Sequence, residues 1–333
     1  MLSDIFTNPA FGLTQMTKAI NKAPFVPGRI RDLGLFAEQG VNTTSVLIEE
    51  QSGQLGLIPS QSRLGPAAVN LPTKRKVRPF AAVHLPLEDS VMSETIQGIR
   101  AFGEESALTP VATVINQRLT TMRNKHELTL EYHRLGAIKG IILDADGTTV
   151  ISNLFTVFGL SQTSIPMALT TSTTEVIVKT SAIRRAVDNA LGGTPYARIH
   201  AFVGSNFFDK LVTLPSTKDA FKFQQSQMLR TDLGATGNLF EIGGITFEEM
   251  SRTLNGQPLI AVDEGYAFPI GAPDLFLTYF APGTFLETAN TIGLPFYAKQ
   301  EAMKYNRGVE IYTESNPLNL CTRPESLIKL TTV

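Results

Sequence analysis

The sequence has almost no cysteine and no long hydrophobic run. Cys321 is the single cysteine among 333 residues. One cysteine excludes an intrachain disulfide framework and a cysteine-rich metal site, and it fits a chain that folds in a reducing compartment. A run of about 18 apolar residues, which a membrane-spanning helix needs, is absent as well. We therefore expect neither a disulfide-rich secreted domain nor an integral membrane protein.

A surplus of either charge is also missing. Lys and Arg total 29 against 30 Asp and Glu, which gives a formal net charge of -1 at pH 7. Such a balance provides no overall attraction to a polyanion, so a dedicated nucleic-acid-binding protein is not expected. Near the start, Asp4 stands where an export signal carries positive charge, and no continuous apolar stretch follows. We expect no cleaved export signal.

What the chain does contain is enough apolar material for a folded core and a distinctive last quarter. Hydrophobic residues make up 43% of the sequence, and the length suits two domains of ordinary size. Residues 274–285 read DLFLTYFAPGTF, residues 290–299 read NTIGLPFYAK, and residues 307–324 read RGVEIYTESNPLNLCTRP. Their β-branched and aromatic runs, separated by Pro and Gly, predict short strands joined by fixed turns. This pattern favours surfaces that meet other proteins over a catalytic site.

The first half of the chain predicts an arm, a hairpin and helices. Residues 1–40 mix isolated apolar side chains with prolines and glycines, as expected of an extended arm. Residues 43–85 predict a long β-hairpin, which would need packing from elsewhere to be stable. A helical pattern covers residues 88–99, and a long helix is predicted from Thr109, its N-cap, to Leu135, before Gly136.

The middle of the chain predicts an α+β region. Two β runs around the ADG turn at 145–147 predict a hairpin. A helix is expected over 173–191, closed by Gly192 and Gly193, and another over 217–230. The Gly243–Gly244 pair between two β runs predicts a tight turn. No repeat of fixed period is present, which argues against solenoids and propellers.

The three motifs of the last quarter resemble those of one family of structural proteins. YFAP at 279–282, NTIGLPFYAK and RGVEIYTESNPLNLCTRP occur in the order found in lambda-type major capsid proteins of tailed phages, the phage major capsid protein E family. The resemblance implies an α+β HK97-like capsid fold. In that fold an N-terminal arm and an extended hairpin loop precede a peripheral domain with a long spine helix, and an axial domain is inserted.

Mapped onto this chain, the resemblance implies four parts. Residues 1–42 would be the arm, and residues 43–86 the extended β-hairpin loop. Residues 87–153 and 283–333 would form the peripheral domain, and residues 154–282 the axial domain. The implied function is a major capsid protein that assembles into hexamers and pentamers of an icosahedral head shell around double-stranded DNA. Implied partners are further copies of itself, a scaffolding protein, a portal, a decoration protein in some relatives and DNA bound non-specifically. The implied location is the virion, after assembly in the host bacterial cytoplasm.

The densest charge cluster lies in the predicted hairpin and consists of Lys74, Arg75, Lys76 and Arg78. Three interpretations are open: phosphate contact, ion pairs with an acidic neighbour, or a solvated strand whose charges prevent edge-to-edge aggregation. Because the cluster lies in the hairpin, we favour contacts between subunits. Glu49 or Glu50 of the opposite strand, or acidic residues of an adjacent subunit, are candidate partners.

One motif competes with the structural interpretation. IILDADGT at 141–148 matches the nucleophile motif of haloacid-dehalogenase-type phosphatases, with Asp144 as nucleophile and Asp146 as acid/base. The motif lies in mid-chain, and Asp263 with Glu264, the nearest acidic pair, lacks the usual spacing for Mg²⁺. A turn is the simpler explanation. A nanocompartment shell protein of the same fold is the remaining alternative.

Two further signals suggest sites but lack necessary partners. HELTL begins with His126 and Glu127 like a zinc-protease motif, but Leu130 replaces the second histidine. We therefore predict that His126 and His133 are solvated or interface side chains. Cys321 has no acid-base partner nearby and is predicted to be a small packed side chain. The sequence predicts no enzyme, no catalytic or metal-binding residue and no cofactor.

Overall fold

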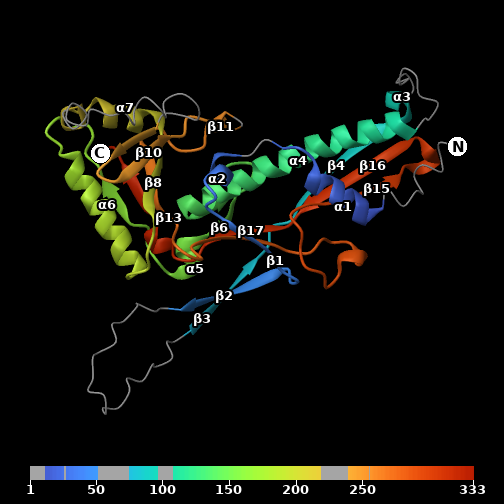
Figure 1. Cartoon of the computed structure of the whole chain (residues 1–333), viewed down its shortest axis with the longest axis horizontal. Helices are drawn as coiled ribbons and strands as arrows, with labels where there is room; N and C mark the ends of the chain where they lie inside the picture. Colours follow the sequence, from blue (N-terminus) through green and yellow to red (C-terminus); the bar gives the residue numbers. More distant parts are fainter. Residues whose placement is uncertain (1–11, 26–27, 52–74, 97–107, 219–238, 255) are drawn as a thin grey trace, which may run out of the picture. The chain divides into compact units, whose positions relative to one another are not determined.

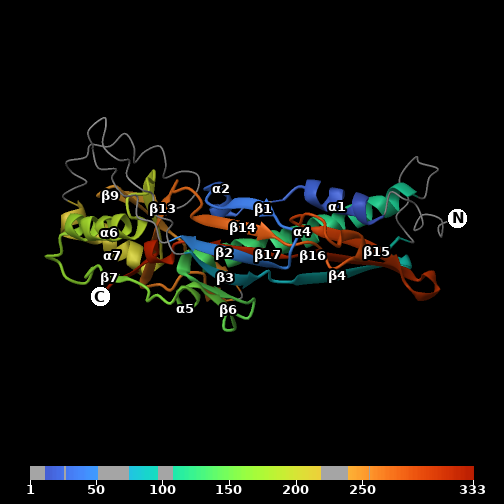
Figure 2. The ribbon, with the colours of Figure 1, turned by 90° about the horizontal axis from the view of Figure 1, so that it is seen from below.

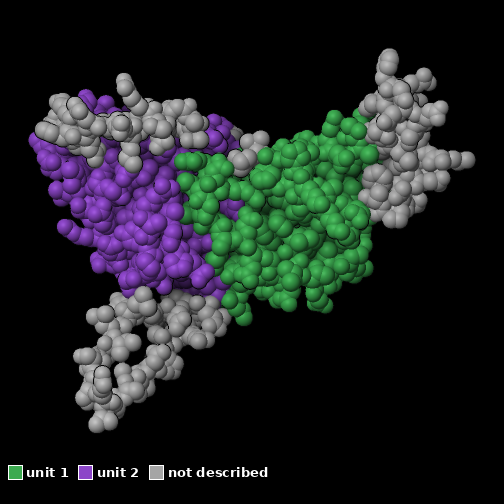
Figure 3. Space-filling view, viewed as in Figure 1, with its two compact units in different colours: residues 1–47, 79–133, 277–319 green, residues 48–78, 134–276, 320–333 purple. Residues whose placement is uncertain are grey.

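The computed structural model describes residues 12–25, 28–51, 75–96, 108–218, 239–254 and 256–333. The chain divides into two compact units, each of which gathers segments far apart in the sequence (Figure 3). Unit 1 comprises Met1–Leu47, Pro79–His133 and Leu277–Asn319. Unit 2 comprises Ile48–Arg78, Arg134–Phe276 and Leu320–Val333. Both units combine helices and strands, so the predicted α+β class is confirmed.

The longest element is helix α4 (Leu108–Lys139, 32 residues), the predicted spine helix (Figure 1). At 1.5 Å per residue it is about 48 Å long. Ile115, Leu119 and Met122 recur at helical spacing and are buried. This apolar stripe explains why the segment folds as one helix against a core.

The predicted end of this helix at Gly136 is wrong, because α4 continues to Lys139. An added Cβ at Gly136 would lie 2.9 Å from the Cα atom of Ile142, so glycine permits a close backbone approach at this position. Gly140, with φ at +82°, follows the last helical residue and has the left-handed conformation that ends helices.

Unit 1 contains a three-stranded antiparallel sheet in the order β15-β16-β4, from Tyr297–Ala302, Gly308–Ser315 and Leu85–Met92. Helix α1 (Leu13–Lys22) and α4 pack on it. The core between them consists of Met16, Ile20, Val91, Val114, Ile115, Leu119, Met122, Phe296, Ala298, Val309 and Ile311. Residues near the start of the chain and residues 296–311 thus share one core.

The helix predicted over 88–99 is wrong for most of its described part. Residues up to Met92 belong to β4, and only the short helix α3 (Ser93–Ile96) follows within the described residues. All eight residues of β4 pair with β16, from Leu85 with Ser315 to Met92 with Gly308. A strand partner more than 200 positions away therefore overrides the local helical pattern.

A second three-stranded sheet, β1-β14-β17, is formed by Ala37–Gly40, Phe276–Phe280 and Pro317–Cys321. Strand β1 runs parallel to β14. The short helices of this part of the chain are α2 (Arg29–Asp32), η3 (Leu286–Thr288) and η4 (Lys304–Asn306). The prediction of short strands and fixed turns in the last quarter is confirmed.

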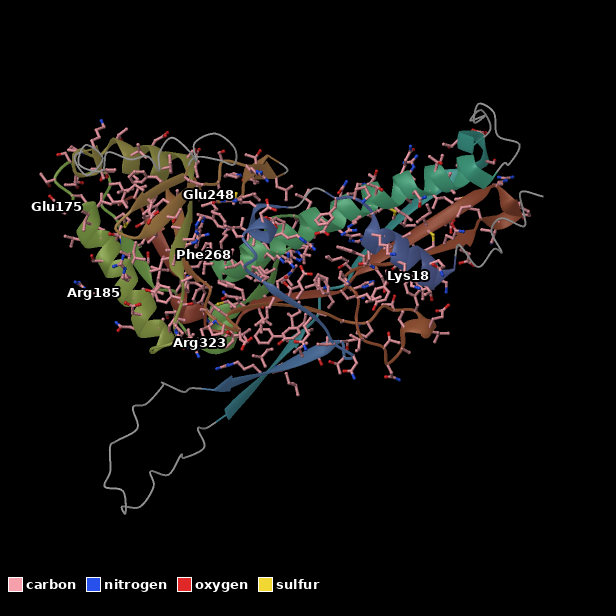
Figure 4. The ribbon with its side chains drawn as sticks, viewed as in Figure 1. Lys18, Glu175, Arg185, Glu248, Phe268 and Arg323 are labelled. Atoms are coloured by element: carbon pink, nitrogen blue, oxygen red, sulfur yellow. The ribbon has the colours of Figure 1, made fainter. Side chains whose placement is uncertain are left out.

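Unit 2 is built on a six-stranded mixed sheet in the order β7-β18-β13-β8-β10-β9. In that order its strands are Ser164–Pro166, Ile328–Thr331, Glu264–Ile270, Arg198–Val203, Ile245–Glu249 and Leu239–Ile242. Its interior includes one polar pair, since Nε2 of His200 lies 3.0 Å from Oε2 of Glu248. The ring of Phe268 lies 5.6 Å from that of His200, and Figure 4 labels Glu248 and Phe268.

Helices α6 (Val176–Leu191), α7 (Ser205–Thr213) and α5 (Leu154–Phe158) belong to the same unit. Gly192 closes α6 in a left-handed conformation, as predicted, and Gly243 and Gly244 form the β9–β10 turn with φ of +59° and +76°. The remaining elements are β5 (Ile141–Leu143), β6 (Val150–Asn153), β11 (Thr253–Leu254), β12 (Gln257–Pro258) and η5 (Pro324–Ser326). The hairpin predicted around 145–147 is confirmed as β5 and β6. Most of the helix predicted over 217–230 lies outside the described residues.

Strands β2 (Ser45–Gln51) and β3 (Arg75–Ala81) pair with each other in a two-stranded sheet (Figure 2). The pairing predicted for the hairpin is therefore confirmed. The connection between the strands, residues 52–74, lies outside the described part of the chain.

Candidate assembly surface

The basic cluster predicted from the sequence is only partly described. Lys74 lies outside the described residues, and so do the side chains of Arg75 and Lys76, whose backbone belongs to β3. Arg78 donates hydrogen bonds to the backbone carbonyls of Val157 and Phe158. Its guanidinium also lies 5.1 Å from the centre of the Phe158 ring. Arg78 thus binds the C-terminal end of α5 in its own chain, where carbonyl groups favour a cation.

Three exposed large apolar side chains lie close together in residues 283–294, which we call the 283–294 loop. Leu286 is 94% exposed, Ile292 70% and Leu294 44%. Leaving three large apolar side chains in water within nine residues forgoes burial worth about 1.5 to 3 kcal/mol each. Such a cluster is typical of a surface that another protein covers.

The 283–294 loop is held firmly although its apolar side chains are exposed. Glu314 is fully buried, and its carboxylate accepts hydrogen bonds of 2.6 Å from both the backbone N–H and the hydroxyl of Thr284. The backbone N–H of Leu294 donates to the hydroxyl of Tyr297 at 2.9 Å, and that of Gly293 to the carbonyl of Val41 at 2.8 Å. A fixed backbone lowers the entropy lost when a partner binds.

An ion pair and a polar bridge complete this anchorage. Lys299 Nζ lies 2.8 Å from Oε1 of Glu287 on the loop, and this bond holds the pKa of the Glu287 carboxyl below its ordinary value. The side chain of Asn316 donates to the carbonyl of Pro282 at 3.1 Å and lies 2.8 Å from Nδ1 of His84. The sequence pattern did not point to Glu314 or Asn316 as anchors. Their sequence neighbours include other polar residues such as Glu310 and Asn319, so nothing in the β run distinguished them.

The Asp144 and Asp146 motif is a turn. Asp146 is exposed and accepts hydrogen bonds from the backbone N–H groups of Thr148 (2.9 Å) and Thr149 (2.8 Å) and from the Thr149 hydroxyl (2.6 Å). The hydroxyl and these N–H groups hold the pKa of Asp146 well below its ordinary value. Asp144 accepts from the N–H of Ala145 at 2.7 Å. Both carboxylates therefore stabilise the β5–β6 turn, as the simpler explanation predicted.

The prediction of solvated or interface histidines on α4 is wrong about exposure, because His126 and His133 are both buried. The Nε2 atom of His126 lies 3.0 Å from Oγ1 of Thr313, and burial lowers the pKa of His126 to about 4. Leu130, where a zinc motif would have its second histidine, is a core residue. The helical face that was interpreted as surface is therefore interior.

The remaining candidate groups have structural roles. Cys321 is buried, as predicted, and burial raises the pKa of its thiol to about 12. Asp263 forms an ion pair with Lys210 at 3.0 Å, and Glu264 forms one with Lys329 at 2.6 Å. Within the described ranges, no three His, Cys, Asp or Glu side chains are arranged to hold a metal ion. None of the helices described there is long and apolar enough to cross a membrane.

Solved structures with a similar arrangement of elements include phage capsid proteins. The putative capsid protein of a prophage of E. coli CFT073 matches with a TM-score of 0.61 and 14% sequence identity, covering 97% of this chain and 99% of that one. The capsid of Myoviridae phage XM1 matches with a TM-score of 0.52 and 8% identity, covering 92% and 93%. The fold is therefore the HK97-like capsid fold that the sequence resemblance implied.

Sequence comparison leads to a family. Residues 12–332 match the family described as phage major capsid protein E. The major capsid protein of Pseudomonas phage KPP10 is 27% identical over 338 residues, covering 96% of both chains. The chain belongs to the phage major capsid protein E family. It is a phage capsid protein that forms the head shell with copies of itself, and this membership favours neither the phosphatase nor the nanocompartment alternative.

Proposed function

We propose that the protein assembles into hexamers and pentamers, and that these build an icosahedral shell around the double-stranded DNA of a tailed phage or prophage. A shell of many identical copies requires each contact to be modest, because closure combines many weak contacts into a stable particle. A structural role without enzymatic turnover or cofactor follows from this proposal.

Within that function we propose roles for the parts expected from the sequence. Residues 1–42 and 43–86 correspond to the arm and the extended loop, residues 87–153 and 283–333 to the peripheral domain, and residues 154–282 to the axial domain. We propose that Lys74, Arg75, Lys76 and Arg78 form contacts between subunits, in addition to the bonds of Arg78 within its own chain. Ion pairs across a contact determine how the two subunits are aligned more than how tightly they bind.

We propose the following partners from the same function. A scaffolding protein guides assembly, a portal occupies one vertex, and a decoration protein is an optional addition outside. DNA is packaged non-specifically, and the net charge of -1 supports this because the chain has no overall attraction to a polyanion. Assembly takes place in the cytoplasm of the host bacterium.

The observation that supports assembly most directly is the 283–294 loop, with Leu286 and Ile292 exposed on a firmly held backbone. We propose that a second copy of the chain covers these two side chains. Burying a leucine side chain contributes about 1.5 to 3 kcal/mol, which is the scale that a shell contact needs. A glutamate at the same position would have to lose its hydration when the contact forms, which would weaken the contact.

The test replaces Leu286 by Glu and Ile292 by Glu, each in the full chain. Assembly is followed by light scattering, and the particles are examined by negative-stain electron microscopy. Each variant is expected to require at least about tenfold more protein to assemble, because one desolvated charge recurs in every copy. Thermal stability should be unchanged, since both side chains are exposed.

The matched control is Val178→Glu, which puts the same charge at an apolar side chain on α6 that is 63% exposed. This variant should assemble like the wild type. Wild-type protein that remains a small particle under all assembly conditions would contradict the proposed function. Normal shells from both loop variants would instead contradict the role of the 283–294 loop alone.

A further inference from the structure

Helix α1 occupies a position where a β-sheet would otherwise have a free edge. Strand β15 is the end strand of the β15-β16-β4 sheet and pairs with β16 on one side. On its other side, the backbone N–H of Ala298 donates to the hydroxyl of Thr17 at 3.3 Å. The side-chain amide of Asn21 donates to the carbonyl of Phe296, the residue immediately before β15, at 2.8 Å. Figures 1 and 2 both place α1 beside this sheet.

The spacing of these two bonds matches a helix that lies along a strand. Thr17 and Asn21 are four positions apart, a rise of about 6 Å in a helix. Ala298 and Phe296 are two positions apart, a distance of about 6.6 Å along a strand, and both bonds use the same edge. Side chains of α1 thus take over a donor and an acceptor that a neighbouring strand would otherwise bind.

Packing and charge hold α1 in this place. Met16 and Ile20 are buried in the core of unit 1. Arg123 of α4 donates to the carbonyl oxygens of Ile20 (2.9 Å), Asn21 (2.6 Å) and Ala23 (2.6 Å) at the C-terminal end of α1. A buried guanidinium at this end satisfies carbonyls that have no partner within the helix, and it favours the helix dipole.

Two more residues of α4 continue this attachment at intervals of one helical turn. Glu127 forms an ion pair with Arg31 at 2.8 Å. Glu131 accepts a hydrogen bond of 2.5 Å from the backbone N–H of Ile30, near the start of α2. Because residues at four-residue spacing share one helix face, Arg123, Glu127 and Glu131 form a single polar stripe that fixes the N-terminal segment.

The opposite edge of the same sheet is blocked by a different device. On β4, the backbone N–H of Ser90 donates to the carboxylate of Asp89 at 2.8 Å. Asp89 also lies 3.5 Å from the guanidinium of Arg118. A charged side chain that takes a backbone donor of an end strand hinders pairing there. Both edges of the sheet therefore carry side chains that bind backbone groups to which a further strand would otherwise hydrogen-bond.

We propose that α1 protects the free edge of β15, so that a strand of a second copy of the chain cannot pair with it. We call this the guard role of α1. Open edges are templates for such pairing, which continues without closing and gives aggregates. A chain that accumulates at high local concentration for shell assembly is especially exposed to this side reaction. The inference rests on the proposed function for its purpose, but not for its structural basis.

The test uses the double variant Thr17→Val, Asn21→Leu in the full chain. Both replacements keep the size and helical character of α1 but remove the two bonds to β15. The control is Lys18→Ala, on the exposed side of the same helix (Figure 4). Hydrogen exchange by mass spectrometry reports on the Ala298 amide, and light scattering with electron microscopy reports on association.

The double variant is expected to exchange the Ala298 amide at least about tenfold faster and to form irregular aggregates at concentrations where wild type and control do not. If it associates like wild type although exchange is faster, the guard role is wrong. If exchange is unchanged, the two bonds do not close the edge, which also contradicts the proposal. Should the double variant fail to fold by circular dichroism, Asn21→Ala is measured in the same way. Irregular aggregation of each variant is compared with that of the wild type. The test of the guard role therefore does not depend on whether the wild type forms shells.

Discussion

His126 lies on α4 with its Nε2 atom 3.0 Å from the Thr313 hydroxyl, and only 4% of the residue is exposed. Burial lowers its pKa from 6.5 to about 4. Between these two values the unfolded chain binds a proton that the folded chain does not. Stability from this residue is therefore complete above pH 6.5 and is lost as the pH falls toward 4.

We predict that the free energy of unfolding decreases by about 3 kcal/mol between pH 7 and pH 4 because of His126, since its pKa is 6.5 in the unfolded chain and about 4 in the folded one. Urea unfolding at a series of pH values measures it. His126→Gln should be less stable at pH 7 but should show a flatter pH dependence above about pH 5, where most carboxylates remain ionised.

The matched control is His84→Gln, since His84 is exposed. It should keep the wild-type pH dependence. An equal flattening in both variants would show that His126 is not the titrating group. The spacing indicated its burial, because His126 stands four positions after Met122 and continues the stripe of Ile115 and Leu119, but its polar side chain favoured an exposed position.

At the level of elements, glycines decide where helices and turns end, and they do so for two different reasons. Gly140 and Gly147 both have positive φ, of +82° and +71°. An added Cβ at Gly140 would overlap the ring of Phe155, whereas no atom lies within 4 Å of one at Gly147. A substitution at Gly147 therefore tests backbone strain alone, whereas one at Gly140 tests backbone strain together with steric overlap.

We predict that Gly147→Ala lowers stability by about 1 kcal/mol, through the unfavourable backbone conformation alone. Gly140→Ala should lower it by about 3 kcal/mol, since overpacking against Phe155 is added. Thermal unfolding of both variants gives the comparison. Equal losses would mean that the Phe155 ring moves aside without energetic consequence.

Elements were predictable where the pattern was local. The αL glycine after α6, the Gly243–Gly244 turn and the β5–β6 hairpin all follow from short-range signals. The prediction over 88–99 failed because β4 is determined by its pairing with β16, a contact that no local window contains. The helix end predicted at Gly136 failed for a similar reason, the close approach of Ile142.

At the level of the whole molecule, a net charge of -1 makes general repulsion between copies small. Any strong dependence of assembly on salt therefore reports local charge contacts. If the basic cluster forms contacts between subunits, sodium chloride should raise the protein concentration needed for assembly by about threefold to tenfold. Light scattering across a salt series measures this.

The double variant Lys74→Ala, Lys76→Ala is expected to lose most of that salt dependence. Lys304→Ala, which removes a single exposed lysine elsewhere, serves as the control and should keep it. The same salt dependence in all three proteins would contradict an inter-subunit role for the cluster. The solvated strand would then be the better interpretation of these residues.

The sequence alone was sufficient to place this protein in its class and family. The motifs of the last quarter resemble those of lambda-type major capsid proteins, and this resemblance implied an α+β shell protein with an HK97-like fold, because short motifs are local properties. Which polar groups are buried, and which segments they bind, became visible in the folded structure. Glu314 anchors the 283–294 loop and Arg123 binds the end of α1 because the fold brings together segments that are 30 and about 100 positions apart in the chain. Burial and partners of a side chain depend on such distant segments, and a pattern along the sequence does not contain them.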